Sequence, residues 1–485
     1  MRFAVLTDTH FINDRAAAVW GRRAGLADIL ALRAVHRLNR YLKPDLVVVL
    51  GDVINDGSLA DAQEQFRTMK EVFDLLACPV LYIPGNHDGD IDAFYRVFPR
   101  PPPYADVAGV RFVSFADLEE PGYNARRAPG NAGLLTQARG GWNGPIVTLQ
   151  HVPIFPPGLI DCPHNYVDAD DVLADMAGND VQLAVGGHCH CGSDLFQTEQ
   201  ASYLVAPALC EAPFPFLMVE VEADQIAVQR HELAMPEALG LVDTHVHTQM
   251  AYCNENLDAV LNLELGKVFG LSSIRIAEHS GHLYYDRAGY GQCGALGLAG
   301  IQAANNRMDA YHRLLAEAGC PSKSVGIEVD VCDDGAPLIL PADSARVAFR
   351  IGAMHQLGSL RTSQPEPEVV AADFLATMER FLESDICSLA HPFRVFRRAG
   401  LPTPPHLFGP VVGLLRAAGV AAEINFHTND PDPEFIRLCI EGGVPLTFGS
   451  DAHNLYEIGE FFPHLQLLRE AGHNGDPSEV LLPLE

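Results

Sequence analysis

This chain of 485 residues has few lysines, no long apolar run and no paired cysteine motif. No apolar stretch approaches the roughly 20 residues of a membrane-spanning helix, and no basic segment followed by an apolar one opens the chain, which argues against a membrane span or a signal peptide. The eleven cysteines are an odd number without zinc-ribbon spacing, which argues against a disulfide framework. We therefore expect a cytoplasmic protein whose thiols are mostly small buried side chains.

Positive charge is also scarce. The chain has 62 acidic against 33 basic residues, only four of them lysine, and its formal net charge is −29. Such a field repels polyanions, so long nucleic acid is a poor candidate for the main substrate. Small phosphates can still bind where carboxylates and histidines gather divalent cations, because each ion adds two positive charges. Oligomeric state leaves no signature in the sequence.

The length, about three times that of a usual domain, predicts two large domains, which we place at residues 1–235 and 240–485. In the first half, apolar runs such as FAVLTD, DLVVVLGD and PIVTLQH end in polar residues, and the apolar spacing over residues 26–42 is helical. This alternation predicts an α/β fold. Its polar residues should gather beyond the carboxyl ends of parallel strands.

The second half has seven strand-like runs, from GLVDTHVH to VPLTFGSDAH, and each ends in a metal-type ligand or another polar residue. Helical stretches at residues 302–318 and 368–384 lie between some of these runs. Such a series predicts a closed or nearly closed β/α barrel with its site at one mouth.

Metal-ligand residues follow the predicted strands of the first half, in the ordered motifs DTH, GD, GNHD, H and GHCH. Such Asp, His and Asn residues, with a carboxylate able to bridge, suit two borderline ions such as Mn, Fe or Zn. Two metals about 4 Å apart can activate a water and hold the attacking and leaving oxygens of a phosphoryl group. The candidate ligands are Asp8, His10, Asp52, Asn86, His151, His188 and His190.

This set resembles the calcineurin-like metallophosphoesterases over residues 8 to 190, and LYIPGNHD is closest to the branch containing class III cyclic nucleotide and glycerophosphodiester phosphodiesterases. The resemblance implies an α/β/β/α sandwich. It implies one metal held by Asp8, His10 and His190, a second held by Asn86, His151 and His188, and Asp52 as the bridge. It also implies His87 as the general acid, with Asp88 orienting it. Cys189 and Cys191, interleaved in GGHCHCG, are either further ligands or buried thiols.

The triplet DTH recurs at residues 243–245, but there the ligand pair is His245 and His247, alternate residues of a strand that point to one side. The repeat is therefore a coincidence of letters and not a copied site. Further candidates follow in the order His279, Glu328, His355, His391, Asp451 and His453.

That order resembles the PHP family, the polymerase and histidinol phosphatase domain, over residues 241 to 455. Its members form a distorted β/α barrel with up to three metals and mostly hydrolyse phosphate esters. The resemblance implies one metal site of His245, His247, Glu328 and Asp451, a second of Glu328, His355 and His391, and a third of His279 and His453. The remaining ligand of the third site falls on Cys253, where histidine or aspartate is more usual. Cys253 is either a ligand, favouring zinc or iron over manganese, or a buried thiol.

Arg394, three residues after His391, is either a phosphate-binding fork or a surface or salt-bridging arginine. Arg275 and Arg361 are weaker candidates. Together the resemblances imply a bifunctional phosphohydrolase, in which a phosphodiesterase opens a small diester, cyclic or linear, and a phosphatase releases phosphate from the monoester. The alternatives are one catalytic domain beside a structural or regulatory one, a metal-dependent binding module, or a nuclease.

Overall fold

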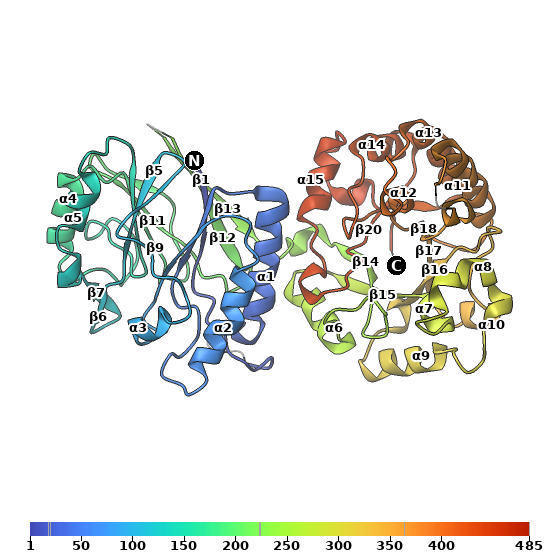
Figure 1. The fold of residues 1–485 in the computed structure, drawn as a ribbon, viewed down its shortest axis with the longest axis horizontal. Helices are drawn as coiled ribbons and strands as arrows, with labels where there is room; N and C mark the ends of the chain where they lie inside the picture. Colours follow the sequence, from blue (N-terminus) through green and yellow to red (C-terminus); the bar gives the residue numbers. More distant parts are fainter. Residues whose placement is uncertain (18, 20, 223–224, 363, 485) are drawn as a thin grey trace. The chain divides into compact units, whose positions relative to one another are not determined.

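The structure, a computed structural model, describes residues 1–17, 19, 21–222, 225–362 and 364–484. The chain folds into two compact units, Met1–Ala234 and Met235–Glu485 (Figure 1). Each unit has its own sheets and its own buried core. Among the described residues, none of the helices combines the length and the apolar character needed to cross a bilayer.

The first unit contains two main sheets, each with parallel and antiparallel pairs of strands. The five-stranded sheet has the order β13-β12-β1-β2-β3, with β1 (Arg2–Leu6), β2 (Leu46–Leu50), β3 (Val80–Ile83), β12 (Pro215–Val221) and β13 (Ile226–Glu232). The six-stranded sheet has the order β10-β11-β9-β8-β5-β4, with β4 (Ala105–Val107), β5 (Val110–Phe115), β8 (Ile146–Gln150), β9 (Leu183–Gly186), β10 (Phe196–Gln197) and β11 (Ser202–Val205). The strands β6 (Leu118–Glu120) and β7 (Asn124–Arg126) form a separate hairpin.

These two sheets pack face to face through the alternate side chains of their strands. Phe3 and Val5 of β1 are buried in the same cluster as Phe112 of β5. The rings of Phe3 and Phe112 meet edge to face with centroids 5.2 Å apart. Because successive side chains of a strand point to opposite faces, Ala4 and Leu6, also buried, cover the other face of the first sheet.

Helices cover the outer faces of both sheets. In Figure 1, α1 (Ala27–Arg37) and α2 (Ala62–Phe73) lie on one side of the first unit, and α4 (Leu134–Arg139) and α5 (Ala169–Gly178) lie on the other. The helix predicted over residues 26–42 continues beyond α1 as one π-helical turn, Leu38–Leu42, and ends where Lys43 adopts a φ of 48°. The prediction of an α/β fold is confirmed.

The second unit contains one sheet of seven parallel strands in sequential order. They are β14 (Val242–Val246), β15 (Ser273–His279), β16 (Val325–Asp330), β17 (Phe349–Ala353), β18 (Ser388–Leu389), β19 (Ala421–Ile424) and β20 (Leu446–Phe448). The first and last strands approach each other, since Thr244 Oγ1 donates a hydrogen bond of 2.9 Å to the carbonyl of Phe448. Val246 also forms an isolated parallel bridge with Ala452. The sheet therefore curls into a nearly closed barrel.

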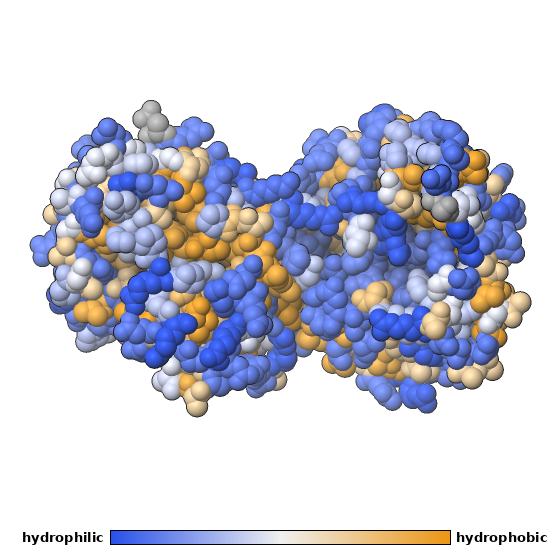
Figure 2. Space-filling model, in the orientation of Figure 1, coloured by the Kyte–Doolittle hydropathy of each residue, from blue (hydrophilic) through white to orange (hydrophobic). Residues whose placement is uncertain are grey.

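Helices surround these strands in Figure 1, and hydrophilic residues cover most of the visible surface of this unit (Figure 2). The longer helices are α6 (Ala259–Val268), α9 (Met308–Glu317), α11 (Pro367–Phe381), α13 (Phe408–Ala418), α14 (Pro433–Gly442) and α15 (Phe462–Glu470). Helix α9 begins at Met308 and not at residue 302, because the side chain of Asn306 accepts a hydrogen bond from the backbone N–H of Met308 and forms a turn there. Helix α11 ends at Phe381, three residues before the predicted end.

A buried histidine links the stability of the first unit to pH. His231 on β13 stacks on Phe216 of β12, with ring centroids 5.2 Å apart. Burial lowers the pKa of His231 from 6.5 to about 4. As the pH falls, the unfolded chain takes up this proton before the folded chain does, so the stability contributed by neutral His231 is present above about pH 6.5 and is lost towards pH 4.

We therefore expect His231→Phe to lose less stability than the wild type between about pH 7 and pH 4.5. Urea unfolding of the full chain at both pH values measures this difference. The exposed His406 provides the control variant His406→Phe, which should follow the wild type. Equal losses in wild type and His231→Phe would contradict the link.

Two candidate metal centres

The predicted ligands of the first unit follow the parallel strands β1, β2, β8 and β9 and the loop after β3. Four of them have a left-handed backbone, with φ values of 54° at Asp8, 49° at His10, 51° at Asp52 and 66° at His188. Non-glycine residues rarely adopt this conformation. It turns the chain sharply at the strand end, so the side chains converge on one region.

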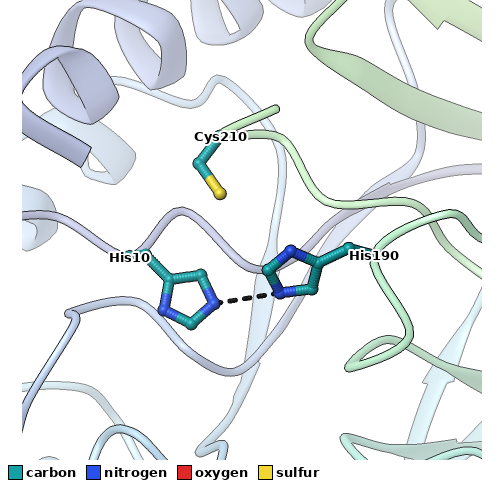
Figure 3. Close-up of side chains that lie close together, drawn as sticks. All are labelled: His10, His190 and Cys210. Atoms are coloured by element: carbon teal, nitrogen blue, oxygen red, sulfur yellow. Dashed lines mark hydrogen bonds between the residues drawn. The ribbon is translucent and has the colours of Figure 1, made fainter. Parts of the chain in front are cut away.

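Asp8, His10 and His190 form one group of donor atoms. The Nε2 atoms of His10 and His190 lie 3.2 Å apart, and the edges of the two rings that carry them are turned toward each other (Figure 3). Asp8 Oδ1 lies 3.5 Å from Nε2 of His190 and 3.8 Å from Nε2 of His10. This buried oxygen accepts no hydrogen bond from the described residues.

Asn86, His151 and His188 form a second group. His151 Nε2 lies 3.2 Å from Asn86 Oδ1 and 3.1 Å from His188 Nδ1. Asp52 joins the two groups, because its Oδ2 lies 3.3 Å from Nε2 of His151 and 3.6 Å from Nε2 of His10. Burial alone raises the pKa of Asp52, but the adjacent His151 and His10 lower it well below its ordinary value. The structure thus brings all seven predicted ligands together.

This donor set fits two divalent cations. Donors bound about 2.1 Å from one cation lie roughly 3.0–3.5 Å from each other, close to the separations observed here. A buried carboxylate oxygen without a hydrogen-bond donor, such as Asp8 Oδ1, is costly unless a cation neutralises it. Imidazole, carboxylate and amide donors suit Mn, Fe or Zn.

Second hydrogen bonds orient the histidines of this site. Nδ1 of His151 lies 2.6 Å from the carbonyl of Leu50, and Nδ1 of His190 lies 2.6 Å from Oε1 of Glu211. If Nδ1 carries the ring proton and donates it to these acceptors, Nε2 keeps its lone pair for a cation. Sequence reasoning missed Glu211, which belongs to no motif and reaches the site from the segment after β11.

The expected role of Asp88 is wrong. Nδ1 of His87 lies 2.7 Å from the carbonyl of Asn55, so that carbonyl and not Asp88 orients the ring. The buried carboxylate of Asp88 accepts hydrogen bonds from the backbone N–H groups of Ile54 and Gly85, at 3.1 and 2.8 Å. Although Asp88 follows His87 in the sequence, its carboxylate binds backbone groups and not the imidazole. Asp88 therefore connects the loop after β2 to the loop after β3.

Gly85 leaves space for the bridging carboxylate. A Cβ atom at this position would lie 2.2 Å from Oδ1 and 2.4 Å from the backbone nitrogen of Asp52. Moving a side chain could not relieve this clash, because the backbone of Asp52 is one of the two contacts. The glycine of GNHD therefore allows the loop after β3 to approach the end of β2 closely.

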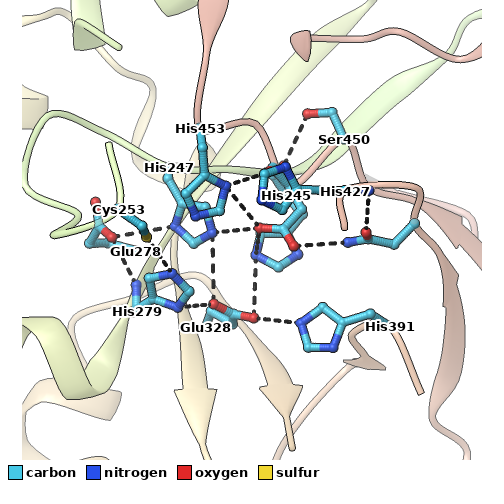
Figure 4. Close-up of polar contacts among 12 residues, drawn as sticks. His245, His247, Cys253, Glu278, His279, Glu328, His391, His427, Ser450 and His453 are labelled. Carbon is cyan, nitrogen blue, oxygen red and sulfur yellow. Dashed lines mark hydrogen bonds and ion pairs between the residues drawn. The ribbon is translucent and has the colours of Figure 1, made fainter. Parts of the chain in front are cut away.

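In the second unit, Glu328 on β16 lies among five imidazoles, and Figure 4 shows it beside His247, His279 and His391. Its Oε1 is near three Nε2 atoms, at 3.1 Å from His391, 3.4 Å from His355 and 3.6 Å from His245. Its Oε2 contacts Nδ1 of His279 and lies 3.8 Å from Nε2 of His247. Asp451 Oδ1 lies 2.8 Å from Nε2 of His247 and 3.6 Å from Nε2 of His245. The two oxygens of Glu328 thus face different groups of donors.

Two residues predicted for a third ion, His279 and His453, also meet. Their donor atoms and those of His247, predicted for the first ion, lie within 4.8 Å of one another. Cys253 Sγ lies 3.5 Å from Nε2 of His279, on an exposed loop after β14. This thiol can reach an ion held by His279.

Outer carboxylates orient the histidines of the second unit. Glu423 on β19 lies 2.9 Å from Nδ1 of His245 and accepts hydrogen bonds from the backbone of His391 and from the side chain of Asn425. Asp330 lies 2.6 Å from Nδ1 of His355. Neither carboxylate was predicted. The available signal was a charged residue inside an apolar run, as Glu423 is in VAAEINFH.

An arginine contacts the predicted ligands in each unit. Arg22 Nη1 lies 3.2 Å from Nδ1 of His10. The Arg394 guanidinium, only 3% exposed, forms an ion pair with Asp451 and lies 2.9 and 2.7 Å from the Nε2 atoms of His355 and His391. Arg394 thus forms a salt bridge, one of the two expected alternatives, and its role as a phosphate-binding fork stays a prediction. Arg361 pairs with Asp333.

Each group of ligands borders a cavity. The cavity of the first unit, about 550 Å³, is lined by residues that include Arg22, Asp52, His87, His188 and His190. The cavity of the second unit, about 470 Å³, is lined by Tyr252, Cys253, His279, His282, Arg287, Tyr290, His355, Arg394, Arg398, His427, Thr428 and His453. Both are large enough for a small phosphate ester beside the metal ligands.

Replacing Glu423 should weaken metal binding in the second unit. Glu423→Gln keeps the size of the side chain but removes the charge that holds His245, so we expect the affinity for Mn²⁺ to fall about 10- to 100-fold. Calorimetric titration of the metal-depleted chain measures this affinity. Glu379→Gln, at an exposed position on α11, is the matched control. Unchanged affinity in a folded Glu423→Gln variant would contradict a role for this carboxylate.

Comparisons with known proteins bear on the first unit. Residues 1–192 match the calcineurin-like phosphoesterase family. A probable cyclic nucleotide phosphodiesterase of Rhodopseudomonas palustris is 31% identical over 173 residues, which cover 33% of this chain and 60% of that protein. The glycerophosphodiester phosphodiesterase GpdQ of Enterobacter lignolyticus is 37% identical over 91 residues, which cover 18% of this chain and 30% of that protein.

Among solved structures, a dimetal phosphatase of Danio rerio aligns with 48% of this chain and 96% of its own, with a TM-score of 0.41 and 15% identity. The chain spans less than two thirds of each of the two phosphodiesterases. The resemblance of the first half to the metallophosphoesterases is confirmed, whereas the resemblance of the second half to the PHP family stays a prediction. Residues 1–192 form a calcineurin-like phosphoesterase domain.

Proposed function

We propose that this chain is a bifunctional metal-dependent phosphohydrolase. The first unit would hydrolyse a small phosphodiester, cyclic or linear, to a monoester, and the second unit, as a PHP-type barrel, would release phosphate from that monoester. One observation carries the proposal. Each unit buries a carboxylate, Asp52 or Glu328, between groups of imidazole donors that border a cavity.

The substrate class of the first unit follows from its relatives. Two of them are named as phosphodiesterases, one for cyclic nucleotides and one for glycerophosphodiesters. Both names describe small diesters, which suit a cavity of about 550 Å³. The net charge of −29 favours a small phosphorylated substrate over long nucleic acid.

The metal ligands of the first unit would be the seven residues that converge there. Asp8, His10 and His190 would hold one cation, Asn86, His151 and His188 the other, and Asp52 both. A pair of divalent cations, Mn, Fe or Zn, supplies an activated water and neutralises charge on the phosphoryl oxygens. Arg22 would have to leave Nδ1 of His10, because that nitrogen must carry the ring proton when Nε2 binds a cation.

His87 would supply the proton to the leaving group. With Nδ1 held by the carbonyl of Asn55, the free ring nitrogen is Nε2, and the residue lines the cavity. A proton on Nε2 can pass to the leaving alkoxide oxygen, which converts a poor leaving group into an alcohol.

In the second unit, His245, His247, Glu328 and Asp451 would hold one cation, and Glu328, His355 and His391 a second. His279, His453 and Cys253 would hold a third. The guanidinium of Arg394 would turn from His355 and His391 towards the cavity that it already borders. There it can pair with two phosphoryl oxygens.

One observation favours a second candidate, in which only the first unit is catalytic. The guanidinium of Arg394 lies against the Nε2 atoms of His355 and His391 and pairs with Asp451, where a cation would bind. In this second candidate, Arg394 takes the place of the metal ions, and the barrel is a structural or regulatory unit.

Product analysis of two variants separates these functions. With manganese and a panel of cyclic and linear diesters, we expect the intact chain to release phosphate. Asp52→Asn should leave the diester intact, while Glu328→Gln should stop at the monoester, because each loses one bridging charge. Losses of about 100-fold or more in the affected step are expected. Each variant is the control for the other, and wild-type phosphate release by Glu328→Gln would reject the second site as the phosphatase.

Cobalt substitution tests the third ion. If Cys253 is a ligand, the Co²⁺-loaded chain shows a near-ultraviolet thiolate-to-cobalt absorption that is lost in Cys253→Ser. Cys320, a free thiol elsewhere in the second unit, provides the control Cys320→Ser. An unchanged spectrum in Cys253→Ser would exclude the thiolate as a ligand.

A further inference from the structure

The wall of the second cavity has a charge opposite to that of the chain. Three arginines and five histidines are among its twelve lining residues, and no carboxylate is. The whole chain has 62 acidic residues and a net charge of −29. A cavity without carboxylates in such a chain is suited to an anionic ligand.

The three arginines have different surroundings. Arg394 is buried against Asp451, His355 and His391. Arg287 donates one hydrogen bond of 3.3 Å to the carbonyl of Tyr252, and among the described residues neither Arg287 nor Arg398 forms an ion pair with a carboxylate. The cavity therefore has two guanidinium groups beyond the one placed at the metal ligands.

Helix α12 (Arg394–Arg398) sets the spacing between these charges. Residues four apart lie on the same helix face, about 6 Å apart along the axis, so Arg398 follows Arg394 along the cavity wall. Arg397 points elsewhere and pairs with Asp430. Of these two adjacent arginines, Arg397 is thus paired with a carboxylate, whereas Arg398 forms no ion pair among the described residues.

Aromatic rings complete this part of the wall. The His282 ring lies between Tyr252 and Tyr290, with centroid distances of 4.6 and 4.2 Å. Flat side chains and guanidinium groups together offer a surface for the carbon skeleton of an ester and for a charged group at its far end.

We propose that the second cavity contains an anion subsite, formed by Arg287 and Arg398, for a second anionic group of the substrate. The substrate would be a phosphomonoester that also carries a carboxylate or another phosphate about one helical turn from the reacting phosphate. This inference rests on the proposed phosphatase function of the second unit and specifies its substrate class.

Two matched pairs of compounds test the subsite. Glycerol 3-phosphate and 3-phosphoglycerate differ in one carboxylate, as do glucitol 6-phosphate and 6-phosphogluconate, at a longer spacing. Dissociation constants are measured by calorimetry on the manganese-loaded full chain carrying Asp52→Asn, and phosphate release is measured in parallel. The double variant Arg287→Gln/Arg398→Gln removes the subsite. Arg397→Gln is the matched control on the same helix.

We expect the carboxylate-bearing member of at least one pair to bind about tenfold tighter, and the double variant but not Arg397→Gln to lose this preference. Equal affinities within both pairs, or equal behaviour of the double variant and Arg397→Gln, would overturn the subsite. If the preference is present but no monoester is hydrolysed, the subsite stands and the phosphatase proposal fails. If monoesters are hydrolysed but neither pair shows a preference, the phosphatase proposal stands and the subsite proposal fails.

Discussion

A buried carboxylate surrounded by imidazoles is the constraint on which both units depend. Asp52 and Glu328 are 1% and 0% exposed, and a buried charge is costly unless positive groups or cations face it. The nearby backbone is shaped around this requirement. A Cβ on Gly85 would strike Asp52, and a Cβ on Gly449 would lie 2.1 Å from Oε1 of Glu423, the carboxylate that holds His245. In both units, therefore, a glycine allows the backbone to approach a buried carboxylate closely, although the sheets of the two units differ in topology.

The two units orient their histidines by different means. In the first unit, backbone carbonyls face Nδ1 of His151 and His87, and Glu211 faces that of His190. In the second unit, His245 and His355 face buried carboxylates, Glu423 and Asp330, while His453 faces the carbonyl of Asp451. The buried carboxylates of the second site attract positive groups, and the guanidinium of Arg394 pairs with one of them, Asp451.

The sequence was sufficient to predict the α/β alternation, the seven strands of the barrel and the convergence of the ligands, because strand ends and metal-type residues are local signals. It was insufficient for the role of Asp88 and for the partner of Arg394. The direction of a side chain beside a motif depends on loop geometry, and the partner of a buried arginine depends on residues such as Asp451, 57 positions away. The start of α9 was missed because a side-chain turn at Asn306 competes with the helix. Glu211 and Glu423 belong to no motif.

The left-handed backbone at the strand ends affects how substitutions in this protein should be interpreted. Asp8, His10, Asp52, His188, His391 and Asp451 all have positive φ. Alanine at such a position removes a donor atom and also the polar side chain that tolerates this backbone, so an alanine scan would combine a loss of stability with a loss of chemistry. Asparagine tolerates this conformation best among non-glycine residues. The free energies of unfolding of Asn and Ala variants at one position therefore differ by the cost of the left-handed turn, whereas their activities also differ because asparagine keeps an oxygen donor.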